Sequence, residues 1–323
     1  MHRLGILPLI LVSVIWGNPH ADAAGERPVR IGALTESWGP TPQIVGLRDG
    51  LIALGYKENA DFVLGVRFTQ GDTEALPAAA RELVQLGARL IFASDGTSAK
   101  AAQVATSGVP IVFGGGGDPI RLGLIQTFAR PGGRVTGVTD LDLELGPKRL
   151  EVFRAIVSTL KRVLFVYNAA DDYGAEEARL YRETARRLGI VLIERPVRTQ
   201  EEARAALLDI RPSTVDGVLQ PRFLSLNIPG FVLEANLQRG IAAMFAGAFW
   251  VERGALASYG ADFYATGRQA ARLVDKILKG AKPAEIPVET NPKVELAINL
   301  KTARALKLTI PPEILYRADR VIE

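Results

Sequence analysis

The sequence predicts an α/β protein of two lobes, each built on a parallel sheet covered by helices. From Val29 onward, short apolar runs alternate with amphipathic segments, and continuous apolar strands separated by helices are typical of sheets buried on both faces. A glycine follows several predicted helices and the next apolar run begins at once, as in Leu188-Gly189-Ile190. Glycine ends a helix readily because it adopts the left-handed conformation. The length of 323 residues favours about two such units.

The first unit extends to about Val138. Its strands are expected at residues 29–34, 62–68, 90–93 and 111–113. Its helices are expected from Thr41-Pro42 to Gly55, from about Glu74 to Leu86, and from about Ser98 onward. A tight turn at residues 130–134 then leads into a strand at residues 135–138, which we interpret as a crossing to the second lobe.

The second unit begins with a helix at residues 145–157 and a strand at residues 163–167. Near the carboxyl terminus, an extended run at residues 256–259 breaks at Gly260. Asp262 then caps a long amphipathic helix that ends at Gly280. This arrangement puts Tyr259 and Asp262 at the carboxyl edge of a sheet, where open α/β folds bind ligands.

The amino terminus is typical of an export signal. A weakly positive start precedes an apolar run from Leu4 to Trp16, and Ala21-Asp22-Ala23 offers the small residues that a signal peptidase reads. We expect residues 1–24 to be a signal peptide cleaved after Ala23 or Ala24. The alternative, an uncleaved anchor, is disfavoured because the run is shorter than the ~20 residues that span a membrane.

Composition excludes several kinds of chemistry. The chain has no cysteine, and its two histidines, His2 and His20, lie in the predicted signal peptide. The mature chain would therefore contain no Ser-His-Asp or Cys-His system and no zinc site with His or Cys ligands. We expect no metal and no cofactor. The net charge of +4 comes from scattered residues, so no nucleic-acid or membrane-surface binding is inferred.

Polar and aromatic residues follow the predicted strands. The segment Asp95-Gly96-Thr97-Ser98 is the best candidate for an anion site, because hydroxyls and unpaired N–H groups at a helix start suit a carboxylate. A plain helix cap explains the same residues. The run Gly114–Gly117 lacks the spacing of a phosphate-binding loop. Trp38, Tyr173 and Trp250 are candidates to stack on a ligand ring or to belong to the core.

Ten segments, in order along the whole mature chain, resemble the substrate-binding proteins of ABC transporters of the tryptophan/tyrosine-binding type. They include Val109-Pro-Ile-Val-Phe113, Asp118-Pro-Ile-Arg-Leu-Gly-Leu-Ile125, Ala129-Arg-Pro-Gly-Gly-Arg-Val-Thr-Gly-Val-Thr139, Glu144-Leu-Gly-Pro-Lys-Arg-Leu150, Ser258-Tyr-Gly-Ala-Asp262 and Gly267-Arg-Gln-Ala-Ala271. The others are Ile277-Leu-Lys-Gly-Ala-Lys-Pro283, Ile286-Pro-Val-Glu289, Ala297-Ile-Asn-Leu-Lys-Thr-Ala303 and Leu308-Thr-Ile-Pro311.

The resemblance implies the type I periplasmic-binding fold, with two Rossmann-like lobes joined by a hinge of crossing strands. Residues 25–138 and 256–287 would form the first lobe, and residues 139–255 and 288–323 the second. It further implies a monomer in the periplasm that closes on a small solute, delivers it to a membrane ABC permease and needs no catalytic residue.

The predicted ligand is an amino acid or an aromatic carboxylate. Thr97 and Ser98 would hold a carboxylate, Asp118 or Asp262 an amino or hydroxyl group, and Tyr259 and Trp38 the apolar part. Arg222 stands where the family often has an acidic residue, and it would pair with a second carboxylate. The full set of expected ligand-binding residues is Ser37, Trp38, Asp95, Gly96, Thr97, Ser98, Asp118, Thr139, Asn168, Tyr173, Arg222, Trp250, Tyr259 and Asp262.

Two other function classes stay open. One is an exported ligand-binding sensor that contacts a membrane receptor rather than a permease. The other is a hydrolase that uses two carboxylates drawn from Glu36, Asp95, Asp118, Asp140 and Asp262, although spacing along the chain does not show which of these lie close together.

Overall fold

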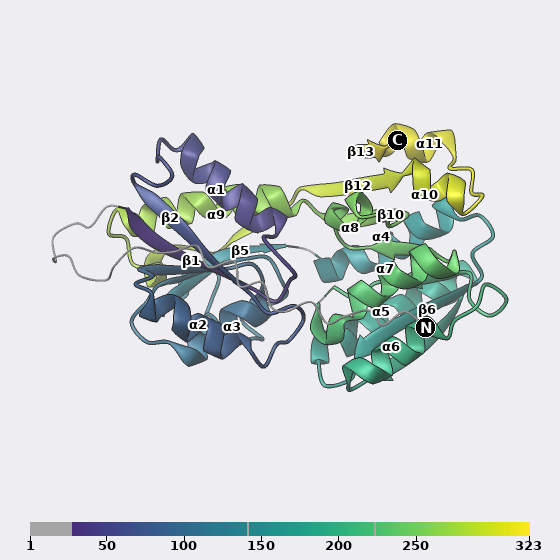
Figure 1. Ribbon diagram of the computed structural model, residues 1–323, viewed down its shortest axis with the longest axis horizontal. Coiled ribbons are helices and arrows are strands. Elements are labelled where there is room, and N and C mark those ends of the chain that lie inside the picture. The colour runs from purple at the N-terminus through teal and green to yellow at the C-terminus, as the bar shows by residue number, and fades with distance from the viewer. Residues whose placement is uncertain (1–27, 141, 223) are drawn as a thin grey trace, which may run out of the picture.

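The computed structural model describes residues 28–323 except residues 141 and 223, and it consists of two α/β lobes side by side (Figure 1). The predicted architecture of two lobes with parallel sheets is confirmed. The expected signal peptide, residues 1–24, lies outside the described residues. Within the described part, no helix has both the length and the apolar character needed to cross a membrane.

The first lobe is built on a parallel six-stranded sheet of order β11-β5-β4-β3-β1-β2. Its strands are β1 (Val29–Thr35), β2 (Phe62–Phe68), β3 (Leu90–Ala93), β4 (Ile111–Gly114), β5 (Val135–Asp140) and β11 (Glu289–Asn291). Helices α1 (Pro42–Ala53) and α9 (Phe263–Leu278) pack on one face, and α2 (Leu76–Gln85) and α3 (Gly96–Ala105) on the other. The short helix η2 (Pro283–Glu285) precedes β11.

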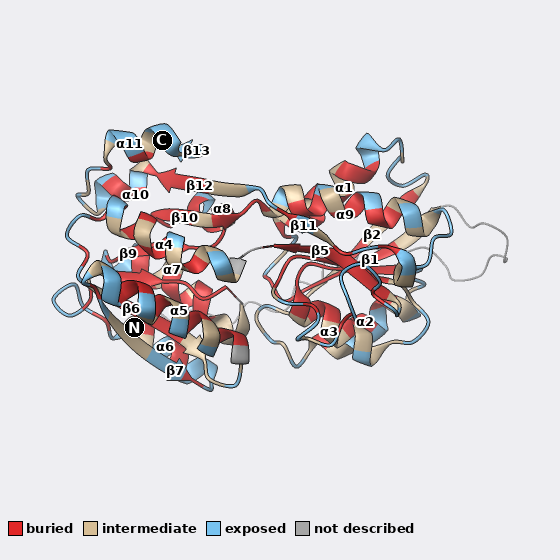
Figure 2. Cartoon of the chain, turned by 180° about the vertical axis from the view of Figure 1, so that it is seen from behind, coloured by how far each residue is buried: buried red, intermediate tan, exposed pale blue. Residues whose placement is uncertain are grey.

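The second lobe has a seven-stranded sheet of order β13-β12-β10-β9-β8-β6-β7, in which β10 and β12 pair antiparallel. Its strands are β6 (Arg162–Asn168), β7 (Val191–Val197), β8 (Gly217–Leu219), β9 (Ala242–Phe245), β10 (Ala257–Ala261), β12 (Val294–Asn299) and β13 (Arg320–Ile322). Its helices are α4 (Asp142–Ile156), α5 (Asp172–Leu188), α6 (Gln200–Leu208), η1 (Ser225–Asn227), α7 (Ile228–Arg239), α8 (Ala248–Glu252), α10 (Leu300–Ala305) and α11 (Pro312–Arg317). The buried residues gather on the sheets and on the helix faces turned to them (Figure 2).

The lobe boundaries differ from the expected ones. Strand β10 was expected in the first lobe, but it pairs with β9 and β12 and so belongs to the second. Strand β11, expected in the second lobe, pairs with β5 in the first, where Glu289 lies opposite Val138. The chain therefore crosses between β5 and α4, between β10 and α9, and between β11 and β12. The apolar pattern of a short strand indicates its burial, but it does not indicate which sheet the strand joins.

Helices α1 and α9 touch backbone to backbone through glycines. A Cβ atom added to Gly46 would lie 2.1 Å from the carbonyl oxygen of Tyr264, and one added to Gly267 would lie 2.0 Å from that of Gln43. Helix α9 begins directly after a crossing, with Asp262 as its N-cap, and α1 follows the loop after β1. The close packing therefore fixes that loop relative to the crossing.

Candidate functional site

The carboxyl ends of strands from both lobes meet at a cavity of about 60 Å³, which we call the interlobe cavity. Loops after β1 and β3 and the start of α1 line it from the first lobe, and loops after β8 and β9 from the second. The lining residues are Thr35, Glu36, Ser37, Trp38, Thr41, Pro42, Gln43, Ser94, Asp95, Gln220, Arg222, Leu224, Ala246, Gly247, Phe249, Trp250 and Phe263. This is the position at which open α/β sheets bind ligands, and it has room for several water molecules.

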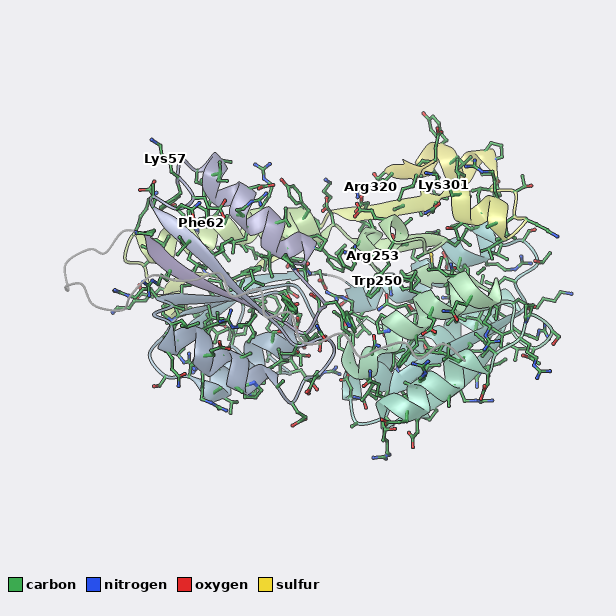
Figure 3. All side chains as sticks on the ribbon, in the orientation of Figure 1. Lys57, Phe62, Trp250, Arg253, Lys301 and Arg320 are labelled. Atoms are coloured by element: carbon green, nitrogen blue, oxygen red, sulfur yellow. The ribbon has the colours of Figure 1, made fainter. Side chains whose placement is uncertain are left out.

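Aromatic rings form one wall of the interlobe cavity. The rings of Trp38 and Trp250 come from different lobes and meet edge to face, with centroids 6.4 Å apart. Trp250 also stacks on Phe245 and meets Phe249 edge to face, each at 5.4 Å. Trp250 lies on the side of the second lobe turned toward the first (Figure 3). Trp38 keeps 38% of its surface exposed, so part of its ring is accessible to a planar ligand group.

Glu36 is the most unusual polar group of the cavity. Only 1% of the residue is exposed. Its Oε1 accepts a hydrogen bond of 3.0 Å from the backbone N–H of Leu224 in the other lobe. Its Oε2 is buried and accepts no hydrogen bond from any residue that the structure describes. Burial of the carboxyl, followed by the nearby charge of Asp95, raises the pKa of Glu36 to about 8.

Asp95 caps helix α3. Its Oδ1 accepts from the backbone N–H of Ser98 at 2.8 Å, and its Oδ2 accepts from the hydroxyls of Ser94 and Ser98, both at 2.9 Å. The expected anion site is thus already used by an internal carboxylate, because both donors of Ser98 point at Asp95. The plain helix cap is the interpretation that the geometry favours.

Arg222 forms an ion pair between the lobes. One guanidinium nitrogen lies 3.1 Å from Oδ2 of Asp140, the last residue of β5. The guanidinium also lies 4.6 Å from the ring centre of Phe263, and the backbone N–H of Arg222 donates to Glu177 at 3.2 Å. Arg222 is 7% exposed and the side chain of Asp140 is fully buried, so the pair is screened little by solvent.

The glycine run beside this pair is explained by close packing. Gly115, Gly116 and Gly117 all have left-handed φ angles, between +85° and +99°. A Cβ atom on Gly115 would lie 2.8 Å from Oδ2 of Asp140, and the N–H of Gly116 donates to the same oxygen at 3.2 Å. Glycine is required at Gly115 because the backbone approaches the ion pair closely, and at Gly116 because the backbone approaches Gly96 and Asp95.

The structure brings five of the expected residues to the interlobe cavity and leaves the others outside its lining. Those that line it are Ser37, Trp38, Asp95, Arg222 and Trp250. Gly96, Thr97 and Ser98 form the first turn of α3 beside it, and Ser98 is fully buried. The hydroxyl of Thr139 donates to the carbonyl oxygen of Gly117 at 3.0 Å.

The remaining expected residues have local partners. Asp118 is exposed and accepts from the backbone N–H of Ile120, and Asn168 accepts from that of Ala170. Tyr173 lies 5.6 Å from the guanidinium of Arg121 of the other lobe, away from the cavity lining. Tyr259 packs half-buried against the core of the second lobe.

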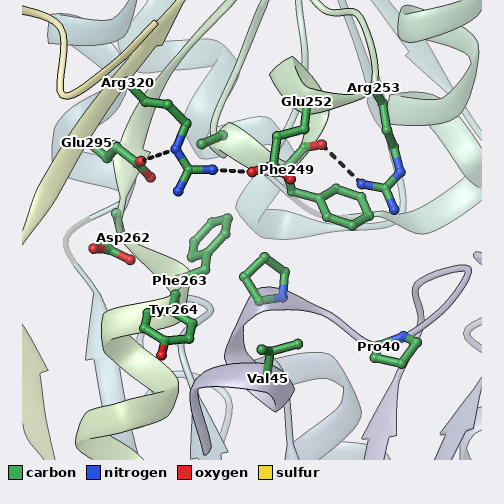
Figure 4. Close-up of a pocket in the computed structure, with 13 residues that line it drawn as sticks. Pro40, Val45, Phe249, Glu252, Arg253, Asp262, Phe263, Tyr264, Glu295 and Arg320 are labelled. Atoms are coloured by element: carbon green, nitrogen blue, oxygen red, sulfur yellow. Dashed lines mark hydrogen bonds and ion pairs between the residues drawn. The ribbon is translucent and has the colours of Figure 1, made fainter. Parts of the chain in front are cut away.

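Asp262 lines a different and larger pocket. Its Oδ1 accepts from the N–H of Ala265, and its Oδ2 lies 2.7 Å from the ammonium of Lys293. This second pocket has a volume of about 300 Å³ and shares Pro42, Phe249 and Phe263 with the interlobe cavity. In Figure 4, Arg320 reaches Glu295 and Glu252 across one side of it, while Phe263 and Tyr264 lie on the other.

The expected set of ligand-binding residues omitted twelve residues of the cavity lining, among them Gln43, Gln220, Phe249 and Phe263. Gln220 lies directly after a strand, which is a usable signal. Phe263 was hidden within a predicted helix. Glu36 was named only as a candidate for hydrolysis, because its hydrogen-bond partner Leu224 is 188 positions away along the chain. Among residues 28–323 outside the two gaps, no group of three or more His, Cys, Asp or Glu side chains is arranged to hold a metal ion.

Comparisons with known proteins give a consistent result. Residues 31–322 match the family described as ABC transporter substrate binding protein. The tyrosine-binding protein of Clostridioides difficile is 26% identical over 295 residues, covering 90% of this chain and 84% of the relative.

Two solved structures are similar at a TM-score of 0.78. One is the ABC domain from Streptococcus pneumoniae in complex with L-Trp, 26% identical, covering 91% of this chain and 99% of that one. The other is a conserved domain protein from Vibrio cholerae, 27% identical, covering 91% and 100%. A solute-binding protein from Bacillus halodurans with bound myo-inositol, 13% identical at a TM-score of 0.55, shares the fold alone.

Proposed function

Since the chain belongs to the family of ABC transporter substrate-binding proteins, we propose that it captures a small organic solute for an ABC importer. The solute is an amino acid or an aromatic carboxylate, and the protein acts as a monomer in the periplasm, where it delivers its ligand to a membrane permease. The single observation that carries this proposal is the interlobe cavity, which is lined by strand ends of both lobes.

The lining of the cavity suits a ligand with a flat ring and a charged end. Trp38 and Trp250 offer ring faces and edges from opposite lobes, and such contacts favour planar ligands. Glu36, Asp95 and Arg222 supply ionisable groups in the same lining. Two relatives carry names that refer to tyrosine and L-Trp, and both ligands have this combination of groups.

Capture works through closure of the lobes. The contacts from Leu224 to Glu36 and from Arg222 to Asp140 join the two lobes, so they form only when the lobes are together. A ligand that touches both lobes binds the closed form more tightly and shifts the population toward it. The volume of about 60 Å³ is below the ~300 Å³ of typical ligand sites, so entry requires the lobes to separate. No step of this cycle needs a catalytic group.

The test is native mass spectrometry of the chain from residue 25 onward, followed by calorimetry with the twenty amino acids and aromatic acids. We expect a bound solute or saturable binding by at least one compound. In Trp38→Ala, loss of the ring should weaken binding about tenfold. Tyr316→Ala removes an aromatic ring that is 92% exposed on α11 and serves as the control. Absence of binding across the panel, or unchanged binding in Trp38→Ala, would contradict the proposal.

A further inference from the structure

We propose that the ligand of the interlobe cavity carries a cationic amine, that Glu36 receives this amine, and that binding releases the proton held by Glu36 in the ligand-free protein. This inference rests on the proposed function. It adds that the solute carries a positive charge and that its binding is coupled to the release of a proton.

The geometry singles out Glu36 among the carboxylates of the cavity. Both oxygens of Asp95 already accept hydrogen bonds from Ser94 and Ser98. Glu36 uses only Oε1, toward Leu224, while Oε2 is buried in the cavity lining with no donor among the residues described. A buried oxygen that lacks a hydrogen-bond partner is costly, so a ligand that brings a donor to it gains by supplying one.

The charges that face Glu36 favour a cation over an anion. Asp95 at the start of α3 and Asp171 at the start of α5 both raise the pKa of Glu36, and they would both repel an anion. Arg222, in the loop after β8, lowers that pKa, as does the N–H of Leu224. The charge of Arg222 is countered by Asp140 at 3.1 Å. The surroundings are therefore net negative once Glu36 ionises, and an ammonium group compensates them.

The proton balance of the step is simple. In the closed form without ligand, burial raises the pKa of Glu36 to about 8, so at pH 7 about nine-tenths of these carboxyls carry a proton. An ammonium ligand pairs with the carboxylate form. The O–H bond of Glu36 breaks, its electron pair remains on the carboxylate, and the proton passes to the buffer. The ligand keeps all three of its N–H bonds.

This linkage predicts how affinity depends on pH. Below pH 8 the ligand must displace a proton, so the dissociation constant should fall about tenfold from pH 6 to pH 7 and about fivefold from pH 7 to pH 8. Calorimetry at pH 7 in buffers of different ionisation enthalpy should report release of about 0.9 protons per ligand bound, and at pH 8 about 0.5.

The experiment compares L-tryptophan and the other amino acids with their desamino counterparts, such as 3-indolepropionate. We expect amino acids to bind with proton release and the desamino acids to bind at least tenfold more weakly. Glu36→Gln keeps an oxygen for the N–H of Leu224, and it should abolish proton release and weaken amino-acid binding at least tenfold. Glu82→Gln, at an exposed position of helix α2, makes the same chemical change away from the cavity and should change neither quantity.

The outcomes separate this inference from the proposed function. Amino-acid binding without proton release, or with the same affinity in Glu36→Gln, would overturn the role of Glu36 and leave the binding function intact. Preferential binding of desamino acids would overturn the inference that the ligand carries a cationic amine. Binding of no compound would overturn the proposed function and this inference with it. Melting temperatures of the variants check that each is folded.

Discussion

Replacing Asp140 with asparagine removes the charge that Arg222 faces between the lobes. The two side chains lie 3.1 Å apart, at 7% and 0% exposure. Loss of one member of a buried ion pair typically costs about 3–5 kcal/mol, since the remaining charge stays buried. Phe263 stays beneath the guanidinium, and the N–H of Gly116 still has an amide oxygen to donate to. We therefore expect the lower end, about 3 kcal/mol.

Urea unfolding at pH 7 measures this loss as a lower midpoint at constant slope. Glu176→Gln is the matched control, because Glu176 pairs with Arg179 at 2.7 Å but the two side chains are 34% and 47% exposed. Such surface pairs contribute at most about 1 kcal/mol. Asp140→Asn combined with Arg222→Met removes both charges and should recover most of the loss.

Two results would refute this reasoning. The first is that Asp140→Asn costs no more free energy of unfolding than Glu176→Gln, which would mean that solvent or another group already compensates the charge of Arg222. The second is that the double variant loses as much free energy of unfolding as the two single variants together, which would mean that the two charges do not interact.

Gly46→Ala should lower the free energy of unfolding, measured by urea unfolding, by about 3 kcal/mol, because the new methyl group would lie 2.1 Å from the carbonyl oxygen of Tyr264. Gly39→Ala is the control: nothing lies within 4 Å of its new methyl group, so the free energy of unfolding should change by less than about 0.5 kcal/mol. Equal effects of the two would contradict the backbone contact of α1 with α9. Glu36→Gln should raise the free energy of unfolding by on the order of 3 kcal/mol at pH 7 and hardly at all near pH 4. The reason is that the raised pKa of Glu36 makes the wild-type protein lose stability as the pH rises from 4.5 to about 8, and glutamine cannot ionise. Thermal melts at both values check this, and an equal shift at each would contradict the buried proton.

Local patterns predicted the elements of the fold well. Strands β2 and β3 have the bounds expected from their apolar runs, and Asp262 caps α9 as its position before a long amphipathic segment indicated. The pattern was informative because burial on both faces of a parallel sheet and capping by a side chain are decided within a few residues. The family resemblance is confirmed as well.

The site was less predictable because its contacts are long-range. Ser98 looked like an anion ligand, but Asp95, only three residues earlier, takes both of its donors. Glu36 gains its unusual environment from Leu224 of the other lobe. Strand β10 fits either sheet by composition, and its pairing with β9 and β12 decides the lobe. Such contacts depend on how the whole chain folds, and no short window of the sequence contains that information.

The three crossings between the lobes have a mechanical consequence. The backbone connects the lobes between β5 and α4, between β10 and α9, and between β11 and β12. A protease cut at any one of them leaves two covalent tethers. Each lobe then remains near the other at an effective concentration in the millimolar range or above, so reassociation stays intramolecular. The lobes of a singly nicked molecule should therefore continue to meet around their ligand, and the hinge does not depend on any one strand of the connection.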